Sequence, residues 1–291
     1  YTLEIIVSKN HMSTDNNTCA NCGKDEENIG DLKACTACKL VKYCNRDCQI
    51  AHRPQHKKAC KKRAAELHDG ALFKDPPPPE DCPICCLPLP GTEETMFRAC
   101  CGKVICDGCC FAAMEGDCER GKKQEDIGLC PFCRMPPVHL DEEEVARVKK
   151  VMERGNADAY SQLALCYSTG SNGVPQDYTK ANELYLKAGE LGDAVAYYNL
   201  GQSYKNGLNV DRDDQKAKYF YELAAMRGEV NARYNLGMIE GRAGNHGRAT
   251  KHFIIAAKSG HNVSLDCVKK GFAAGIVTKD EYEQALRAYH E

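Results

Sequence analysis

The stretch that organises the chain reads CPICCLPLPGTEETMFRACCGKVICDGCC over residues 82–110 and closes with CPFCR over residues 130–134. It carries four pairs of cysteines: Cys82 and Cys85, Cys100 and Cys101, Cys106 and Cys109, and Cys130 and Cys133. Two thiolates in a C-x-x-C turn can reach the same ion, as tetrahedral zinc requires. One such pair would also suit a redox site, but four pairs within about fifty residues predict two structural zinc sites.

The order of these pairs resembles a RING finger. The resemblance implies that the first and third pairs hold one zinc ion and that the second and fourth pairs hold the other. Adjacent Cys100 and Cys101 are the least usual ligands, because most RING fingers separate the two and many use histidine. Cys101 lies at the more typical distance before Cys106. The remaining cysteines of the stretch could substitute as ligands, but they are more typical of packing residues or exposed thiols: Cys86, Cys110 and Cys118.

Some RING fingers hold a charged ubiquitin-conjugating enzyme and position its thioester-linked ubiquitin. The resemblance implies three contact residues here, namely Ile84, Pro131 and Arg134, and the guanidinium fork of an arginine suits a bridging contact. Ala113 stands where such fingers usually carry a large apolar residue, and Met114 follows it. The alternative is that the three residues only pack the finger or lie on its surface.

Composition sets limits on the rest of the chain. The 291 residues are 43% hydrophobic and 7% aromatic and include no Trp, which favours small metal-stabilised modules and Ala-rich helices. Twenty cysteines without a signal peptide or an apolar span favour a reducing compartment, either cytoplasmic or nuclear, and metal over disulfides. The net charge of −2 makes a nucleic-acid partner unlikely, and no membrane partner is expected. Residues 1–15 are expected to be an unstructured or vector-derived leader.

A second metal cluster is predicted within residues 16–66. Its candidate ligands are Cys19, Cys22, Cys35, Cys38, Cys44, Cys48, His56 and Cys60. The x-x-x spacings place two ligands on one face of a helical turn, whereas the x-x spacings fit tight knuckles. Eight ligands make two sites, and four protein ligands per ion leave no open position for water. Each structural ion supplies on the order of 10 kcal/mol of folding free energy to so small a core.

This cluster resembles a MYND-type zinc finger, a module that docks short proline-containing peptides. The resemblance implies one ion shared by Cys19, Cys22, Cys44 and Cys48, and another shared by Cys35, Cys38, His56 and Cys60. Arg53 stands where the family commonly has Trp, so the peptide surface departs from the family pattern. His52 is expected to be a packing or surface residue and not a ligand.

The segments between the modules are predicted from composition. Residues 67–79 are expected to be a linker, since DPPPPE over 75–80 favours extended polyproline II. The RING-like module then covers 80–138, with a short helix over 111–121, and 139–154 form a connecting helix with Asp141 as its N-cap. A basic run is either a nuclear localisation signal or the solvated face of a helix: Lys57, Lys58, Lys61, Lys62 and Arg63.

Residues 155–291 contain an internal repeat. Glycines recur as Gly155, Gly192, Gly228 and Gly260, at intervals of 37, 36 and 32 residues. Four, eight and twelve residues later follow Ala159, Ala196, Ala232 and Ser264; Leu163, Leu200, Leu236 and Val268; and Tyr167, Tyr204, Glu240 and Phe272. The second halves carry Ala181, Ala217 and Ala249; Tyr185, Tyr221 and Phe253; and Ala188, Ala224 and Ala256. These steps lie on one stripe of a helix, which predicts stacked helix pairs with an Ala/Tyr core.

The repeat pattern resembles Sel-one-like repeats, relatives of the tetratricopeptide repeat, over about residues 155–260. Thr278 and Glu281 are expected to form a capping box on a C-terminal helix, and Cys166 and Cys267 are expected to pack in the core. The predicted fold class is therefore two zinc modules followed by an all-α solenoid, with about four structural zinc ions.

Two functions follow from this organisation. The leading hypothesis is a RING-type ubiquitin-protein ligase, in which the repeats and the MYND finger recruit protein substrates. The alternative is a non-catalytic zinc-dependent scaffold for protein partners. No phosphate-binding GxxxxGK[ST] motif, GxSxG elbow or HExxH helix occurs in the sequence.

Overall fold

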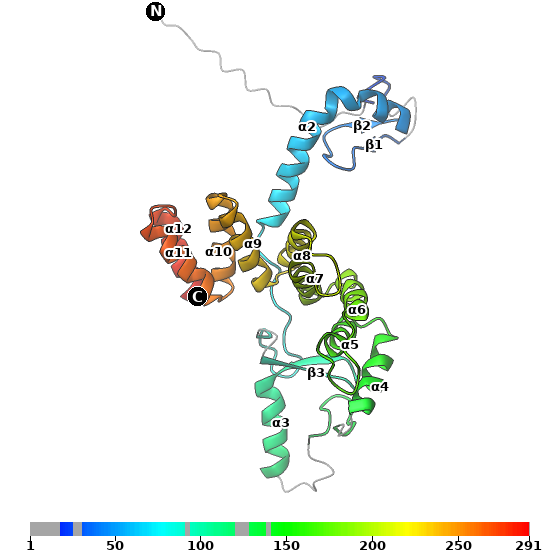
Figure 1. Ribbon diagram of the computed structural model, residues 1–291, viewed down its shortest axis with the longest axis vertical. Coiled ribbons are helices and arrows are strands. Elements are labelled where there is room, and N and C mark those ends of the chain that lie inside the picture. The colour runs from blue at the N-terminus through cyan, green and yellow to red at the C-terminus, as the bar shows by residue number, and fades with distance from the viewer. Residues whose placement is uncertain (1–17, 26–30, 91–93, 120–127, 138–140, 291) are drawn as a thin grey trace, which may run out of the picture. The chain divides into compact units, whose positions relative to one another are not determined.

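The computed structural model describes residues 18–25, 31–90, 94–119, 128–137 and 141–290, so the predicted leader, residues 1–15, lies outside the described residues. The chain divides into two compact units, Tyr1–Leu72 and Phe73–Glu291. Their elements are labelled in Figure 1. Each unit is described by itself below.

The first unit is a small hairpin followed by a long helix. Strand β1 (Lys33–Ala34) pairs antiparallel with β2 (Lys42–Tyr43), and helix α2 spans Arg46–Leu72. The Asn45 side chain accepts a hydrogen bond from the Cys48 amide at 2.8 Å, which satisfies a free N–H of the first turn. Helix α2 therefore runs six residues into the predicted linker, past Pro54. That part of the prediction is wrong, because the polar residues after His56 are good helix formers.

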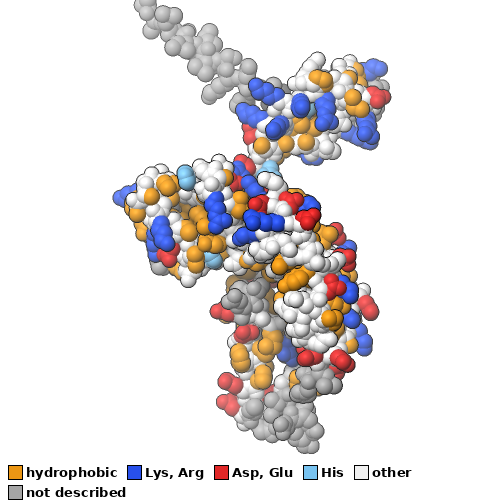
Figure 2. Space-filling model, viewed as in Figure 1, with side chains coloured by type: hydrophobic (Ala, Val, Ile, Leu, Met, Phe, Trp, Pro, Cys, Tyr) orange, Lys and Arg blue, Asp and Glu red, His pale blue; other side chains and the backbone are white. Residues whose placement is uncertain are grey.

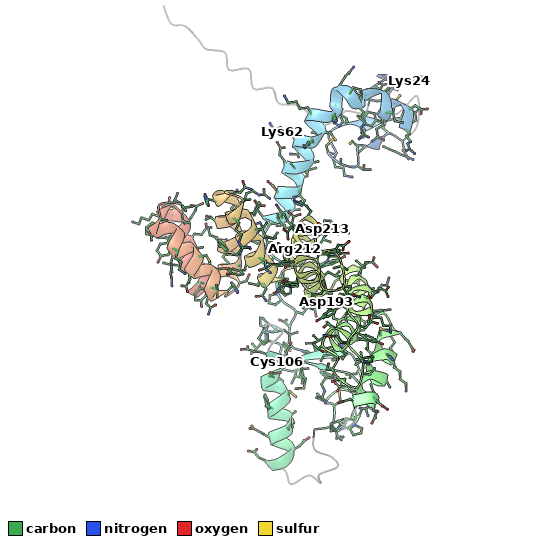
Figure 3. The ribbon with its side chains drawn as sticks, in the orientation of Figure 1. Lys24, Lys62, Cys106, Asp193, Arg212 and Asp213 are labelled. Carbon is green, nitrogen blue, oxygen red and sulfur yellow. The ribbon has the colours of Figure 1, made fainter. Side chains whose placement is uncertain are left out.

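The basic run lies on α2. Lys57, Lys58, Lys61 and Lys62 are exposed and Arg63 is half-buried. Figure 2 shows Lys and Arg side chains gathered over this region beside hydrophobic ones, and Lys62 is labelled on the helix in Figure 3. The run thus forms a solvated helical face.

The second unit opens with residues 75–80, which have no regular secondary structure, as predicted. Strand β3 (Thr95–Arg98) then pairs antiparallel with β4 (Lys103–Cys106), and α3 spans Asp107–Glu119. This helix begins four residues before its predicted start at Phe111. Asp107 in the first turn favours the earlier start, since an acidic side chain is stabilising at a helix N-terminus.

The cysteine-rich stretch of residues 82–134 is called the zinc segment below. Helix α4 (Asp141–Met152) joins it to the repeats through a shared core. It begins at Asp141 itself, one residue earlier than the predicted cap implies. Its three buried valines are Val145, Val148 and Val151. They share one cluster with Ala99, which follows β3, and with Ala159 and Leu163 of the first repeat. At Gly102, where φ is +75°, an added Cβ would lie 2.6 Å from Val151 Cγ1. Asn156 Nδ2 also donates to the Gly102 carbonyl at 3.3 Å.

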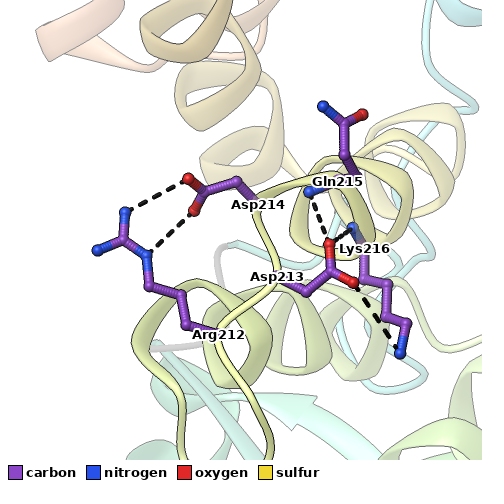
Figure 4. Close-up of polar contacts among 5 residues, drawn as sticks. All are labelled: Arg212, Asp213, Asp214, Gln215 and Lys216. Carbon is purple, nitrogen blue, oxygen red and sulfur yellow. Dashed lines mark hydrogen bonds and ion pairs between the residues drawn. The ribbon is translucent and has the colours of Figure 1, made fainter.

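The remainder of the second unit is a stack of helix pairs. The helices are α5 (Ala157–Thr169), α6 (Tyr178–Glu190), α7 (Ala194–Asn206), α8 (Asp214–Met226), α9 (Val230–Arg242), α10 (His246–Lys258), α11 (Asn262–Ala273) and α12 (Lys279–His290). Aspartate caps recur at their N-termini. At α8, Asp213 accepts from the Gln215 and Lys216 amides at 3.0 and 2.9 Å, while Arg212 pairs with Asp214 (Figure 4).

The predicted Ala/Tyr stripe forms the core of this stack. The alanines of the stripe are 5% exposed or less, and Tyr185 and Tyr221 are buried. Gly201 permits a close approach, since a Cβ there would lie 2.5 Å from the Tyr221 ring. Phe272 is less buried than the rest of the stripe. It is 40% exposed and stacks on Tyr282 of α12.

The last helix confirms the predicted capping box. The Thr278 amide donates to Glu281 Oε2 at 2.9 Å, and the Glu281 amide donates back to Thr278 Oγ1 at 3.3 Å. Of the two spare repeat cysteines, Cys166 is buried, as expected, and Cys267 is half-buried. Among the described residues, no helix has the length and apolar character needed to cross a membrane.

Candidate metal centres

The structure gathers all sixteen candidate ligands into four clusters. The clusters are Cys19, Cys22, Cys44 and Cys48; Cys35, Cys38, His56 and Cys60; Cys82, Cys85, Cys106 and Cys109; and Cys100, Cys101, Cys130 and Cys133. Within each cluster the ligand atoms lie within 4.8 Å of one another. We call them sites 1 to 4 in that order. The groupings match the ligand sharing that each resemblance implied.

The sulfur separations fit tetrahedral zinc. Zn–S bonds of about 2.3 Å place two sulfurs about 3.8 Å apart on a tetrahedron. The structure has separations of 3.7 Å for Cys22 and Cys44, 3.8 Å for Cys35 and Cys60, 3.9 Å for Cys85 and Cys106, and 3.7 Å for Cys101 and Cys130. In site 2, His56 Nε2 faces Cys38 Sγ at 3.2 Å. The four clusters are compatible with about four structural zinc ions.

One half of every site is a knuckle with the same backbone. In four C-x-x-C turns, one from each site, the residue after the second cysteine has a left-handed φ: Gly23 at +71°, Lys39 at +57°, Cys86 at +57° and Arg134 at +60°. Its amide donates to the carbonyl of the first cysteine at 2.8–3.0 Å in all four turns. Non-glycine residues adopt this conformation rarely. Cys86 therefore closes a knuckle, a role that the sequence analysis missed, although the spacing after Cys85 matches that of Gly23 after Cys22.

The first cysteine of each knuckle is buried and poised as a thiolate. Burial raises the pKa of the Cys19 thiol, but backbone amides of Cys22, Cys44 and Asn21 outweigh it and bring the pKa to about 6. Burial likewise raises the pKa of Cys82, but the backbone amides of Cys106, Cys85 and Ile84 outweigh it and bring the pKa to about 6. A thiolate is the form that binds zinc.

The second half of sites 1 and 3 is a strand that turns into a helix. Cys44 follows β2 and Cys48 lies in the first turn of α2, while Cys106 ends β4 and Cys109 lies in the first turn of α3 (Cys106 is labelled in Figure 3). A second thiolate beside the first is disfavoured without a cation. The pKa of Cys109 is raised to about 12, chiefly through its hydrogen bond with Cys106. A divalent ion would remove this repulsion.

Sites 2 and 4 are completed in other ways. His56 and Cys60 lie one turn apart on α2, and the His52 ring stacks on the His56 ring at 5.6 Å. His52 Nδ1 lies 3.0 Å from the Tyr43 hydroxyl, so His52 packs beside the site and is not one of its grouped ligands. In site 4, Cys100 and Cys101 both come from the turn between β3 and β4. The four-residue turn 99–102 can therefore bring adjacent cysteines to one site.

The other spare cysteines of the stretch are not grouped with a site. Cys110 is 5% exposed and packs with Cys82 and Ile105. The side chain of Cys118 lies outside the described residues. Since each site brings four protein ligands together, the sites are structural by chemistry, with no ligand position left for a reacting water.

The three predicted conjugating-enzyme contacts lie on the surface of the zinc segment. Ile84 is 41% exposed, and Pro131 and Arg134 are exposed on the last knuckle. Leu87 and Phe132 add exposed apolar area to the same two knuckles. These side chains are thus free to meet a partner rather than packed within the segment.

The first unit carries a groove beside site 2. Its volume is 580 Å³, and Gln49, Ile50 and Tyr43 contribute to its lining. Four basic residues also line it: Arg46, Arg53, Lys57 and Lys61. No acidic residue is among the described residues that line the groove. Arg53, at the position where Trp was expected from the family pattern, therefore lies on a basic groove wall.

Comparisons with known proteins identify parts of the chain. The model of the MYND finger matches residues 19–60, and the model of the Sel1 repeat matches residues 157–193, 194–229 and 230–261. The chain is 30% identical over 100 residues, 34% of its length, to the ERAD-associated E3 ubiquitin-protein ligase component HRD3B of Arabidopsis thaliana. It is 31% identical over 96 residues, 33% of its length, to the chitin synthase regulator SKT5 of Saccharomyces cerevisiae. The matches span only 15% and 14% of those two proteins.

Solved structures show a similar likeness. A Sel1 repeat protein from Oxalobacter formigenes is 24% identical, with 51% of this chain and 63% of that chain covered and a TM-score of 0.45. The protective antigen c5321 of uropathogenic Escherichia coli is 21% identical, with 63% and 38% covered and a TM-score of 0.45. The two family models show that the chain contains a MYND finger and three Sel1 repeats, in a Cys-rich zinc-binding region followed by an all-helical solenoid. Helical repeats of this kind present extended surfaces that bind other proteins.

Proposed function

We propose that residues 80–138 form a RING-type finger that receives a charged ubiquitin-conjugating enzyme, and that the Sel1 repeats and the MYND finger hold the protein to be modified. The observation that carries the proposal is the alternation of sites 3 and 4. The first cysteine pair meets the third and the second meets the fourth, so two ions would brace one small module. This alternation is the arrangement that the resemblance to RING fingers implies.

The surface of the module supports the same function. Ile84 and Pro131 offer an apolar contact, and Arg134 offers an exposed guanidinium beside it. Catalysis by such a finger is a positioning effect, in which a bound conjugating enzyme is held in a reactive arrangement. Ala113 is half-buried on α3, while Met114 beside it is 44% exposed and supplies the larger apolar side chain.

The zinc segment and the first repeat share one hydrophobic core, which supports a fixed spacing between them. Phe97 packs against the cluster formed by Val145, Val151 and Leu163, and the Asn156–Gly102 hydrogen bond lies at the same junction. A protein bound to the repeats would therefore be held at a fixed distance from the conjugating enzyme. One relative, similar over 100 residues of this chain, is itself named as a ligase component, which supports a role in substrate presentation.

We expect the zinc-loaded protein to stimulate ubiquitin-chain formation by at least one member of a conjugating-enzyme panel, with activating enzyme, ubiquitin and ATP present. Ile84→Ala and Arg134→Asn should each lower the rate about tenfold or more, as central contacts of an interface do. Asparagine is chosen because it tolerates the left-handed backbone at position 134. The measurement is chain formation resolved by gel electrophoresis.

Matched controls are Ile276→Ala and Arg154→Asn, which change exposed residues outside the module and should leave the rate unchanged. If no conjugating enzyme is stimulated, the ligase proposal fails and the scaffold function stands alone. If activity persists in both Ile84→Ala and Arg134→Asn, the contact surface is placed wrongly.

The lining of the groove beside site 2 supports one class of peptide partner for the MYND finger. We propose that it takes an acidic proline-containing peptide, since four basic residues line it and it retains the apolar Ile50. A peptide flanked by glutamates should bind about tenfold tighter than its glutamine counterpart at low salt, and the difference should shrink as salt screens the charges. Fluorescence anisotropy measures both affinities.

Arg53→Ala should remove most of this charge preference. Lys62→Ala is the control, because Lys62 belongs to the same basic run but does not line the groove. Equal affinity for the glutamate and glutamine peptides would show that the groove does not select acidic partners.

A further inference from the structure

The chain's own segment Phe73–Pro77 lies against the third repeat. In Figure 1 the segment that leads to β3 passes beside α9. The Lys74 carbonyl accepts a hydrogen bond from Arg233 Nη2 at 3.1 Å. Asp75 pairs with Lys258 at 3.8 Å, and Pro77 lies close to Gly228. Residues of this one segment thus contact α9, α10 and the turn between α8 and α9.

The Phe73 side chain is half-buried and contacts α10. Its ring lies 4.8 Å from the ring of His252, and Arg248 and Lys251 lie over it at 5.0 and 5.4 Å from its centroid. Cations over an aromatic face are attracted by its quadrupole. Three basic residues of α10 therefore surround one aromatic side chain.

This part of the third repeat departs from the other repeats. Arg233 stands at the register of Tyr160 and Tyr197, and His252 stands at the register of Leu184 and Phe220. Arg233 is 2% exposed and His252 is fully buried, and neither ring nitrogen of His252 has a hydrogen-bond partner among the described residues. Burying such groups costs free energy unless a partner compensates them.

The polar substitutions coincide with the contacts to the linker. Arg233 meets the Lys74 carbonyl, and His252 meets the Phe73 ring. A repeat with only a structural role would carry at these two positions the kinds of residue that the first two repeats carry, namely tyrosine, leucine or phenylalanine. The polar residues of the third repeat instead contact the linker, which points to recognition of a peptide segment at this site.

We propose that the third repeat is a binding site for extended Phe-x-Asp-Pro-Pro segments, with Phe73–Pro77 as its resident ligand, and that a partner protein carrying such a segment binds by displacing it. A hollow of 1220 Å³ continues the site beside the prolines, lined in part by Pro79, Glu229 and Asn231. It gives space for a longer ligand than the linker. Displacement would release the linker before the zinc segment while the core around Val151 stays intact.

The test uses the full chain and a fluorescent peptide of residues 73–80, FKDPPPPE. In the wild-type protein the tethered segment competes at an effective concentration in the millimolar range. The double variant Phe73→Ala/Asp75→Ala removes the competitor, so it should bind the peptide about tenfold tighter than wild type does. The control peptide AKAPPPPE should bind neither protein.

A second variant tests the proposal even if the double variant does not fold. Asp75→Lys changes a side chain that is 78% exposed and keeps Phe73, so it should bind the peptide with intermediate affinity. Adding Lys258→Glu to the double variant should weaken FKDPPPPE about threefold and favour FKKPPPPE instead. The proposal is overturned if neither variant binds more tightly than wild type, or if FKDPPPPE and AKAPPPPE bind equally.

Discussion

Replacing Cys130 with serine is expected to unfold the zinc segment around β3 and β4 and to remove at least one zinc ion. Cys130 is fully buried, and its pKa of about 6, in which knuckle amides outweigh burial, makes it the readiest thiolate of site 4. A structural ion contributes on the order of 10 kcal/mol, which is comparable with the whole stability of a domain. Hydrogen exchange measured by mass spectrometry should show loss of protection over residues 94–110.

Cys86→Gly is the matched control for this experiment. Cys86 lies in the same stretch, but its left-handed φ of +57° marks it as the residue that closes a knuckle. Glycine relieves the strain of that conformation, so the variant should keep its zinc and be equal to the wild type or up to about 1 kcal/mol more stable. Zinc loss in Cys86→Gly, or full protection in Cys130→Ser, would contradict the ligand assignment.

Replacing Glu240 with alanine is expected to cost about 2–3 kcal/mol of stability, because it removes a buried carboxylate whose hydrogen bonds to two partly exposed cations stabilise the third repeat. Glu240 is 1% exposed and accepts from Lys218 at 2.8 Å and from Asn245 at 2.8 Å, with Arg248 at 3.3 Å. It stands where the other repeats carry an aromatic residue, so the third unit replaces an aromatic contact with an ion network. Urea unfolding at neutral pH measures the loss.

The contribution of Glu240 to the free energy of unfolding is expected to fall as the pH falls. Burial raises the pKa of Glu240, but Lys218, Asn245 and Arg248 outweigh it and bring the pKa to about 2. Glutamate in an unfolded chain titrates near pH 4.3, at about the model-peptide value. The stabilisation by Glu240 is therefore fully present above that pH and is lost as the pH falls towards 2.

The difference between wild type and Glu240→Ala should accordingly stay constant from pH 8 to pH 6. Glu190→Ala is the control, since Glu190 forms an exposed pair with Lys187 that is worth at most about 1 kcal/mol. An equal cost for the two variants would show that the buried network does not stabilise the third repeat.

Much of the fold could be predicted because its signals are local and periodic. The ligand spacings indicated which residues form pairs, the resemblances to RING and MYND fingers implied which pairs share an ion, and the Ala/Tyr register indicated which residues are buried, as at Ala159 and Tyr221. The length of α2 was underestimated, because the helix continues through Gly70 to Leu72 although a glycine is typical of a helix end.

The remaining features depend on contacts between distant residues. The linker was predicted to be a spacer from DPPPPE, and residues 75–80 have no regular secondary structure, but no local pattern announces that Phe73 packs on His252. The sequence signal for this contact was Arg233, which stands where the first two repeats carry tyrosine. The role of Cys86 was also readable in principle, because it follows its knuckle in the same position as Gly23.

Native mass spectrometry of the full chain tests the central claim most directly, because the number of bound zinc ions reports whether both Cys-rich segments are metal modules. The four clusters predict a mass that corresponds to four zinc ions per chain. A protein that retains only two ions, with Cys82 and Cys130 open to alkylation, would contradict the account, since sites 3 and 4 and the ligase proposal built on them would be lost.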